Sequence, residues 1–232
     1  MKDSRRGFPP FILDLSQWYA QRKADRSLPD ALAEASLHQL YELLELYPWV
    51  VEGSASVQEG GIADLPWDYT EELLERSSGG VYLLRGFIDP AGSEKDSWRN
   101  QLKHAADDVH AKGSQLFVRV SGCAGGLLQE IAETGVDCIE GVCCPPQGDT
   151  MMAKARSIAG NHVLLWGGLP QEYLLPSWEH RDFKKMAQYI AEEACCEPNV
   201  ILGAAGGVPP ETDFTRIRYL SGLYKQMEEV FF

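Results

Sequence analysis

The sequence lacks any apolar run long enough to cross a bilayer, since VYLL and VLLW fall far short of the about 20 residues that a spanning helix takes. It also lacks an apolar segment after its basic start, MKDSRRGFPP, so we expect no signal peptide and a cytoplasmic location. Basic residues are sparse, with a formal net charge of −13 and only short clusters such as SRRG. Because phosphate contacts need clustered Lys and Arg, nucleic acid is not an expected partner.

Cysteine pairs at the C-x-x-C spacing of metal sites and redox motifs are also missing. The six cysteines include no C-x-x-C pair, and two of their spacings are vicinal. Vicinal cysteines do not readily bridge to each other, and cytosolic chains rarely carry structural disulfides. We therefore expect buried, reduced thiols, while a zinc site assembled from distant cysteines has no support in the spacing.

What the sequence does have is an alternation of strands and helices in its second half. β-Branched and aromatic runs predict strands, and amphipathic segments closed by glycine predict helices. Strands are predicted at 115–122, 136–142, 162–168 and 199–207, with helices at 126–135, 149–160 (opened by Asp149 as N-cap), 180–196 and after 213. The last helix is expected to bury Ile217, Leu220, Leu223 and Tyr224. This order is typical of parallel βα units, whose chemistry lies at the carboxyl ends of the strands.

The first half is less regular. It predicts a first strand that runs into a loop over 9–19, further strands at 49–55 and 81–87, and helices at 28–47 and 93–113, with a loop and a short helix over 57–80. That makes seven strands at most, and a complete eight-stranded barrel typically takes about 250 residues. The chain is short by that standard.

A glycine-rich turn, VILGAAGGVPPETDF, joins the last predicted strand to the last helix. Such turns can cradle a phosphate, because bare backbone N–H groups approach an anion there. This loop contains no Lys, so a phosphate site is the weaker interpretation.

Several blocks together resemble the last four βα units of the uroporphyrinogen decarboxylase superfamily. They are AKGSQLFVRVSG, LLQEIAETGVDCIEG, PPQGDTMMAKARSIAG, VLLWGGLPQEYLL and VILGAAGGVPPETDFTRI, and the resemblance is strongest over 94–230. PPFILDLSQWYAQRKADRSLP is similar to the opening strand and loop of the family. The resemblance implies one domain over 1–232, an α/β TIM-type (β/α)8-like barrel that is shortened or incomplete.

The superfamily includes decarboxylases of uroporphyrinogen and zinc methyltransferases that move methyl groups between corrinoids and thiols. The positions of the His-x-Cys zinc ligands hold Arg119 and Ser121 here, and the third thiol ligand corresponds to Gly206. None of these can replace a thiolate or imidazole, so zinc is not expected. The arginine-rich opening loop of the decarboxylase is also missing from DLSQWY, and its histidine in the final glycine loop would again fall at about Gly206.

Polar residues still stand where a barrel mouth would lie. Glu140 falls inside a predicted strand, where an unpaired carboxylate is costly, and Arg119 on the neighbouring strand is its natural partner. The pair is either structural or, with Asp14, catalytic. Candidate ligand-binding residues near the same edge are Ser121, Asp149, Trp18, Tyr19, Trp166, Gly206 and Gly207, among which Asp149 reads better as a helix cap.

Two functions follow as hypotheses. The first is a methyltransferase-like protein acting with a corrinoid, or corrinoid protein, on a small organic substrate. The alternative is a non-catalytic or partner-dependent barrel that binds a small molecule or tetrapyrrole. Uroporphyrinogen decarboxylation ranks below both. Because missing barrel strands would expose sheet edges, we expect a homodimer.

Overall fold

The computed structural model describes residues 9–46, 81–85, 95–195 and 197–231. Five parallel strands form one sheet in the order β1-β2-β3-β4-β5. Their bounds are β1 Val81–Arg85, β2 Gln115–Arg119, β3 Cys138–Cys143, β4 Leu164–Pro170 and β5 Val200–Ala205. The chain is thus an α/β protein with a parallel sheet, as the strand–helix alternation predicts.

An N-terminal segment lies along the far edge of β5. It forms parallel bridges at Phe11↔Leu202 and Asp14↔Gly207, so its carboxyl end reaches the same edge as the ends of the strands. Within the described residues the sheet is open, with this segment at one edge and β1 at the other. The predicted strand at 49–55 and the segment 57–80 lie outside the described residues.

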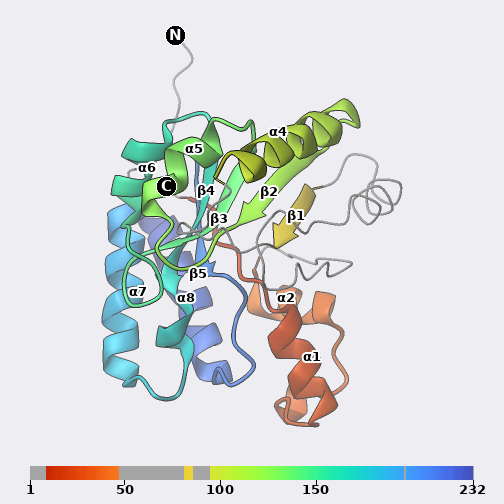
Figure 1. Ribbon diagram of the computed structural model, residues 1–232. Coiled ribbons are helices and arrows are strands. Elements are labelled where there is room, and N and C mark those ends of the chain that lie inside the picture. Colours follow the sequence, from red (N-terminus) through yellow and green to blue (C-terminus); the bar gives the residue numbers. More distant parts are fainter. Residues whose placement is uncertain (1–8, 47–80, 86–94, 196, 232) are drawn as a thin grey trace.

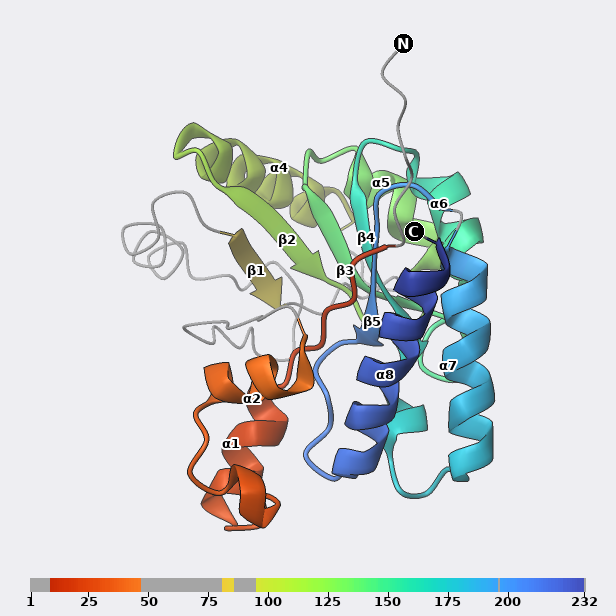
Figure 2. The ribbon, with the colours of Figure 1, turned by 180° about the vertical axis from the view of Figure 1, so that it is seen from behind.

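Helices pack against the sheet and beyond its carboxyl ends. Figures 1 and 2 show α7 and α8 side by side along one flank and α1 and α2 beyond the strand ends. The bounds are α1 Ser16–Ala24, α2 Leu37–Leu44, α4 Lys95–Ala111, α5 Leu128–Ala132, α6 Met152–Ala159, α7 His180–Ala194 and α8 Phe214–Phe231, with short 3-10 turns at Asp30–Leu32, Gly125–Leu127 and Gln171–Leu174. The helix that should follow the last strand is confirmed, and it buries Ile217, Leu220, Leu223 and Tyr224 as expected.

The two faces of the sheet carry different cores, because neighbouring residues on a strand point to opposite faces. Leu116, Val118, Ile139, Leu165 and Leu202 belong to the main core shared with the helices. Phe117, Cys138, Trp166 and Ile201 form a separate small cluster. This second cluster defines an inner face, on which the next residues along β2 and β3 are Arg119 and Glu140.

Three local expectations are wrong. The helix expected over 28–47 is split, because Ser36 forms a capping box with Gln39 and starts α2 afresh at Leu37. The segment 9–19, expected as a first strand that runs into a loop, does pair with β5, but the helix α1 begins at Ser16 where the loop was expected. Asp149 caps no helix, since α6 begins at Met152 after an N-cap residue, Met151, that makes no side-chain bond.

None of the helices in the described ranges is long and apolar enough to span a membrane.

Candidate functional site

Three charged side chains meet at the carboxyl-end edge of the sheet. Asp14 ends the N-terminal segment, Arg119 ends β2, and Glu140 lies within β3. Arg119 and Glu140 are register partners across the β2–β3 pair. Residues two apart on a strand share a face, so both continue the inner face begun by Phe117 and Cys138. We call Asp14, Arg119 and Glu140 the charged cluster.

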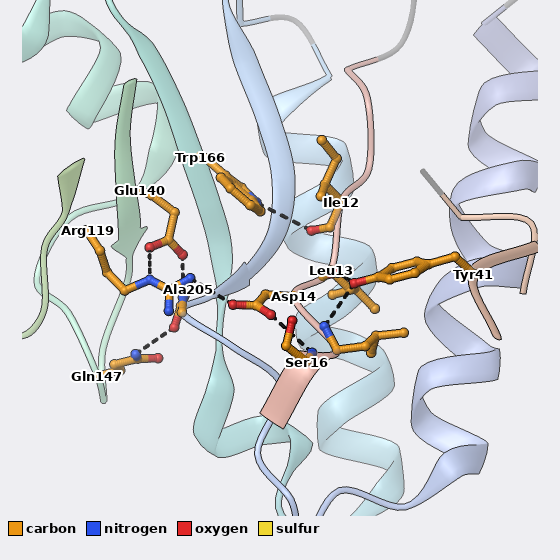
Figure 3. Close-up of polar contacts among 12 residues, drawn as sticks. Ile12, Leu13, Asp14, Ser16, Tyr41, Arg119, Glu140, Gln147, Trp166 and Ala205 are labelled. Carbon is orange, nitrogen blue, oxygen red and sulfur yellow. Dashed lines mark hydrogen bonds and ion pairs between the residues drawn. The ribbon is translucent and has the colours of Figure 1, made fainter. Parts of the chain in front are cut away.

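The contacts of the cluster are direct (Figure 3). Arg119 Nε donates to Oε2 of Glu140, and Arg119 Nη2 donates to Oδ2 of Asp14 at 3.3 Å. The second oxygen of Glu140, Oε1, accepts the backbone N–H of Gly206 at 2.9 Å. The second oxygen of Asp14, Oδ1, accepts the backbone N–H of Ser16 at 3.1 Å. The Arg119–Glu140 partnership expected from the sequence is present, and Asp14 joins it.

Burial differs among the three side chains. Glu140 is 0% exposed and Asp14 2%, whereas Arg119 is 17% exposed. Burial raises the pKa of Glu140 above its ordinary value, although Arg119 and the Gly206 N–H oppose that rise. Burial alone would lower the pKa of Arg119, but Glu140 and Asp14 outweigh it and the net direction is upward. Arg119 is therefore a permanent cation held between two carboxyl groups.

A glycine immediately after Glu140 makes the local backbone feasible. The register between β3 and β4 shifts between Glu140 and Val142, which marks a β-bulge. Gly141 has φ +98°, and a Cβ there would lie 2.2 Å from the carbonyl oxygen of Val120. Only glycine accommodates both constraints, so the bulge beside Glu140 depends on it.

Aromatic side chains fix the N-terminal segment that carries Asp14. The Tyr41 hydroxyl, on α2, donates to the Leu13 carbonyl at 2.7 Å and accepts the Leu15 N–H at 3.1 Å. The Trp166 indole N–H donates to the Ile12 carbonyl at 3.4 Å from the inner face. Asp14 is thus held on both sides by buried hydrogen bonds.

Gln147 was not singled out by the sequence analysis. Its amide nitrogen donates to the Ala205 carbonyl at 2.8 Å, and its amide oxygen accepts the Gln171 N–H at 2.7 Å. It therefore ties the loop after β3 to the end of β5 and to the turn after β4. The only sequence feature that could have indicated this role is the position of Gln147 in the PPQGD loop, at the carboxyl end of a strand.

The other predicted ligand-binding residues lie in varied surroundings. Trp18 is buried, with its indole N–H bonded to the Thr212 carbonyl, and this placement gives it a packing role. The Tyr19 hydroxyl donates to the Ala35 carbonyl on the same side of the molecule. Asp149 is exposed and accepts the N–H of Gly125, which holds the loop after β2.

The remaining candidates lie closer to the cluster. Trp166 is fully buried in the inner-face apolar group. Ser121 is half-buried just after β2, and Gly206 and Gly207 are half-buried just after β5. Gly206 contacts the cluster through its backbone, and Gly207 is bridged to Asp14.

A metal centre does not emerge from the part of the chain that the structure describes. No three His, Cys, Asp or Glu side chains there are grouped so as to hold an ion. Cys138, Cys143 and Cys144 are buried, and Cys123 is exposed. Arg119, Ser121 and Gly206, which the sequence resemblance sets against zinc-ligand positions, carry a guanidinium, a hydroxyl and no side chain, and none of these is a zinc ligand.

The fold and the cluster together define an α/β protein with a polar site at the carboxyl ends of parallel strands. Among solved structures the chain is similar to a methyltransferase from Methanosarcina mazei, with a TM-score of 0.55 and 17% sequence identity. The match covers 69% of this chain and 45% of that chain, so this chain spans less than half of the length of the methyltransferase. No protein-family model and no curated protein matches the sequence. At this identity the likeness concerns the fold.

Proposed function

We propose that this chain is a methyltransferase-like protein of the uroporphyrinogen decarboxylase superfamily type, acting with a corrinoid on a small organic substrate. The observation that carries the proposal is the charged cluster, because it lies at the strand ends where βα enzymes hold their chemistry. The similarity in fold to a protein named a methyltransferase supports it. The barrel architecture belongs to the proposal too: the N-terminal segment beside β5 has the place of a first strand that closes on the last.

The residues of the charged cluster suit a methyl transfer that needs a proton acceptor and a hydrogen-bond donor held in a fixed position. A corrinoid, when bound, supplies a methyl group that leaves cobalt without the bonding electron pair. On the protein side, a substrate hydroxyl or thiol must lose a proton as its oxygen or sulfur gains the methyl group. Glu140, whose pKa burial raises, takes up this proton when the bound substrate replaces one of the two hydrogen bonds that its carboxylate accepts from Arg119 and the Gly206 N–H. Arg119 orients the substrate heteroatom.

The test is methyl transfer from free methylcobalamin to a panel of small thiols, alcohols and amines, with methylated products identified by mass spectrometry. We expect one chemical class to be methylated at a rate that saturates with substrate. A panel without any product above the protein-free rate would contradict the proposal.

The second candidate is a partner-dependent ligand-binding barrel. It is favoured by the open sheet of the described residues, whose edges are the N-terminal segment and β1. Exposed sheet edges are normally covered, and a second copy of the chain is the simplest cover, so we propose a homodimer. Saturable binding of a tetrapyrrole or small ligand, without methyl transfer, would favour this candidate over the first. Light scattering on the purified protein tests the dimer.

A further inference from the structure

Two of the three positions that correspond to zinc ligands in the resembled methyltransferases meet at one carboxylate. Those positions are 119, 121 and 206. Arg119 Nε contacts Oε2 of Glu140, and the Gly206 N–H contacts Oε1 at 2.9 Å. Glu140 is therefore the carboxylate at which these two positions meet, and the cation beside it is a guanidinium.

The Glu140 carboxylate needs a cation beside it, whether that cation is a metal ion or a side chain. Its side chain is fully buried, and a buried carboxylate without compensation is far more costly than a paired one. A guanidinium meets the need with a fixed positive charge and five N–H donors in a planar fork. Unlike a metal ion, it cannot dissociate.

Arg119 retains a donor for something else. Its Nε donates to Glu140 and its Nη2 donates to Asp14. In the described part of the chain, Nη1 donates no hydrogen bond. Arg119 is also the one member of the cluster with appreciable exposure, at 17%. The free donor thus belongs to the most accessible side chain of the three.

We propose that Arg119 is a built-in cation that takes the place of a bound metal. It balances Glu140 and Asp14 and offers Nη1 to an acceptor atom of a ligand at the strand ends. The site then works without a metal ion. This proposal concerns the cation alone and stands whether or not the ligand becomes methylated.

The first test restores metal-binding donors. The double variant R119H/S121C would supply an imidazole at the register partner of Glu140 and a thiol two residues further along the chain. With Glu140 these are three protein ligands of the kinds that zinc accepts. Gly206 is left unchanged because its φ of +96° disfavours a cysteine. We expect one Co²⁺ per chain, seen by thiolate-to-cobalt absorption, with affinity at least about 100-fold above that of the wild type. Adding E140Q should lower this affinity by about tenfold or more.

A matched control is available on α4. Arg99 of α4 pairs with Glu130 of α5, and Gln101 is two residues beyond Arg99 on α4. Residues two apart on a helix face different directions, so R99H/Q101C should bind Co²⁺ no better than the wild type. A folded R119H/S121C variant that binds no tighter than this control would overturn the proposal. So would stoichiometric zinc in the purified wild-type protein.

A double-mutant cycle decides the matter if R119H/S121C does not fold. R119M should lower the folding equilibrium constant by about 100-fold or more, because Glu140 loses its nearest counter-charge. In an E140Q background, the fall in the folding equilibrium constant caused by R119M should be smaller by a factor of at least about ten. If R119M costs the same in both backgrounds, Arg119 does not balance Glu140 and the proposal is wrong.

Discussion

Arg119 and Glu140 are direct neighbours across the β2–β3 pair, and the Arg119 Nε donates to the Glu140 carboxylate. Their backbone register fixes the contact, so it does not depend on a flexible loop. Asp14 reaches the same guanidinium from the N-terminal segment, 105 residues away in sequence. One strand pair and one long-range bridge thus assemble the cluster.

The pH dependence of stability should report Glu140. Its pKa is raised above the ordinary 4.5, so the folded chain holds this proton more tightly than the unfolded chain. The protonation of Glu140 therefore adds to the free energy of unfolding. This contribution is complete below about pH 4.5 and is lost as the pH rises through the pKa of Glu140 in the folded chain. Urea unfolding of wild type and E140Q across this range should show a steeper fall for the wild type. An unchanged difference between the two proteins at every pH would argue against the raised pKa.

The bulge beside Glu140 should tolerate only glycine at position 141. G141A places a methyl group 2.2 Å from the Val120 carbonyl oxygen, at φ +98°. We expect a loss of about 2 kcal/mol or more in the free energy of unfolding. G126A is the control, since a Cβ at Gly126 meets nothing within 4 Å, and it should change stability little. Equal stability of the two variants would refute the described bulge.

Removing the Tyr41 hydroxyl should loosen the segment that carries Asp14. Y41F leaves the Leu13 carbonyl and the Leu15 N–H without this buried partner, which we expect to cost about 1–3 kcal/mol. Y189F, at an exposed tyrosine, should be neutral. Hydrogen exchange at Leu15 should accelerate in Y41F alone. Unchanged exchange there would mean that other contacts hold the segment.

Thiol reactivity should follow burial. Cys123 is exposed, whereas Cys138 and Cys143 are buried and burial raises the pKa of both thiols. Brief alkylation of the native protein, read by peptide mass spectrometry, should label Cys123 well before the other two. Denaturant should remove the difference. Early labelling of Cys138 in native protein would contradict its place on the inner face.

The sequence predicts the parallel sheet well because its strands and helices are local patterns. Arg119 and Glu140 could be paired in advance because a charged residue inside a buried strand demands a nearby partner. The hydrogen bond from Gly206 to Glu140 was not predictable, because its donor is a backbone N–H and the residue type gives no sign of it. The bridging role of Gln147 was not predicted, because its two hydrogen-bond partners, Ala205 and Gln171, are distant in sequence and come close only in the folded chain.

The start of the chain shows the limit of local patterns. The run 28–47 is helical in composition throughout, yet the Ser36–Gln39 capping box divides it. That division places Tyr41 on a separate helix, from which its hydroxyl reaches the segment before Asp14.

The most direct test of the role of Glu140 is the rate of methyl transfer from methylcobalamin, compared among wild type, E140Q and E130Q. Glu130 is also paired with an arginine, Arg99, but on the helical layer away from the charged cluster. We expect E140Q to lower kcat/KM by about 100-fold or more, as loss of a general base does, and E130Q to match the wild type. Equal rates for E140Q and wild type, with both proteins folded, would contradict the assignment of the reaction to this cluster.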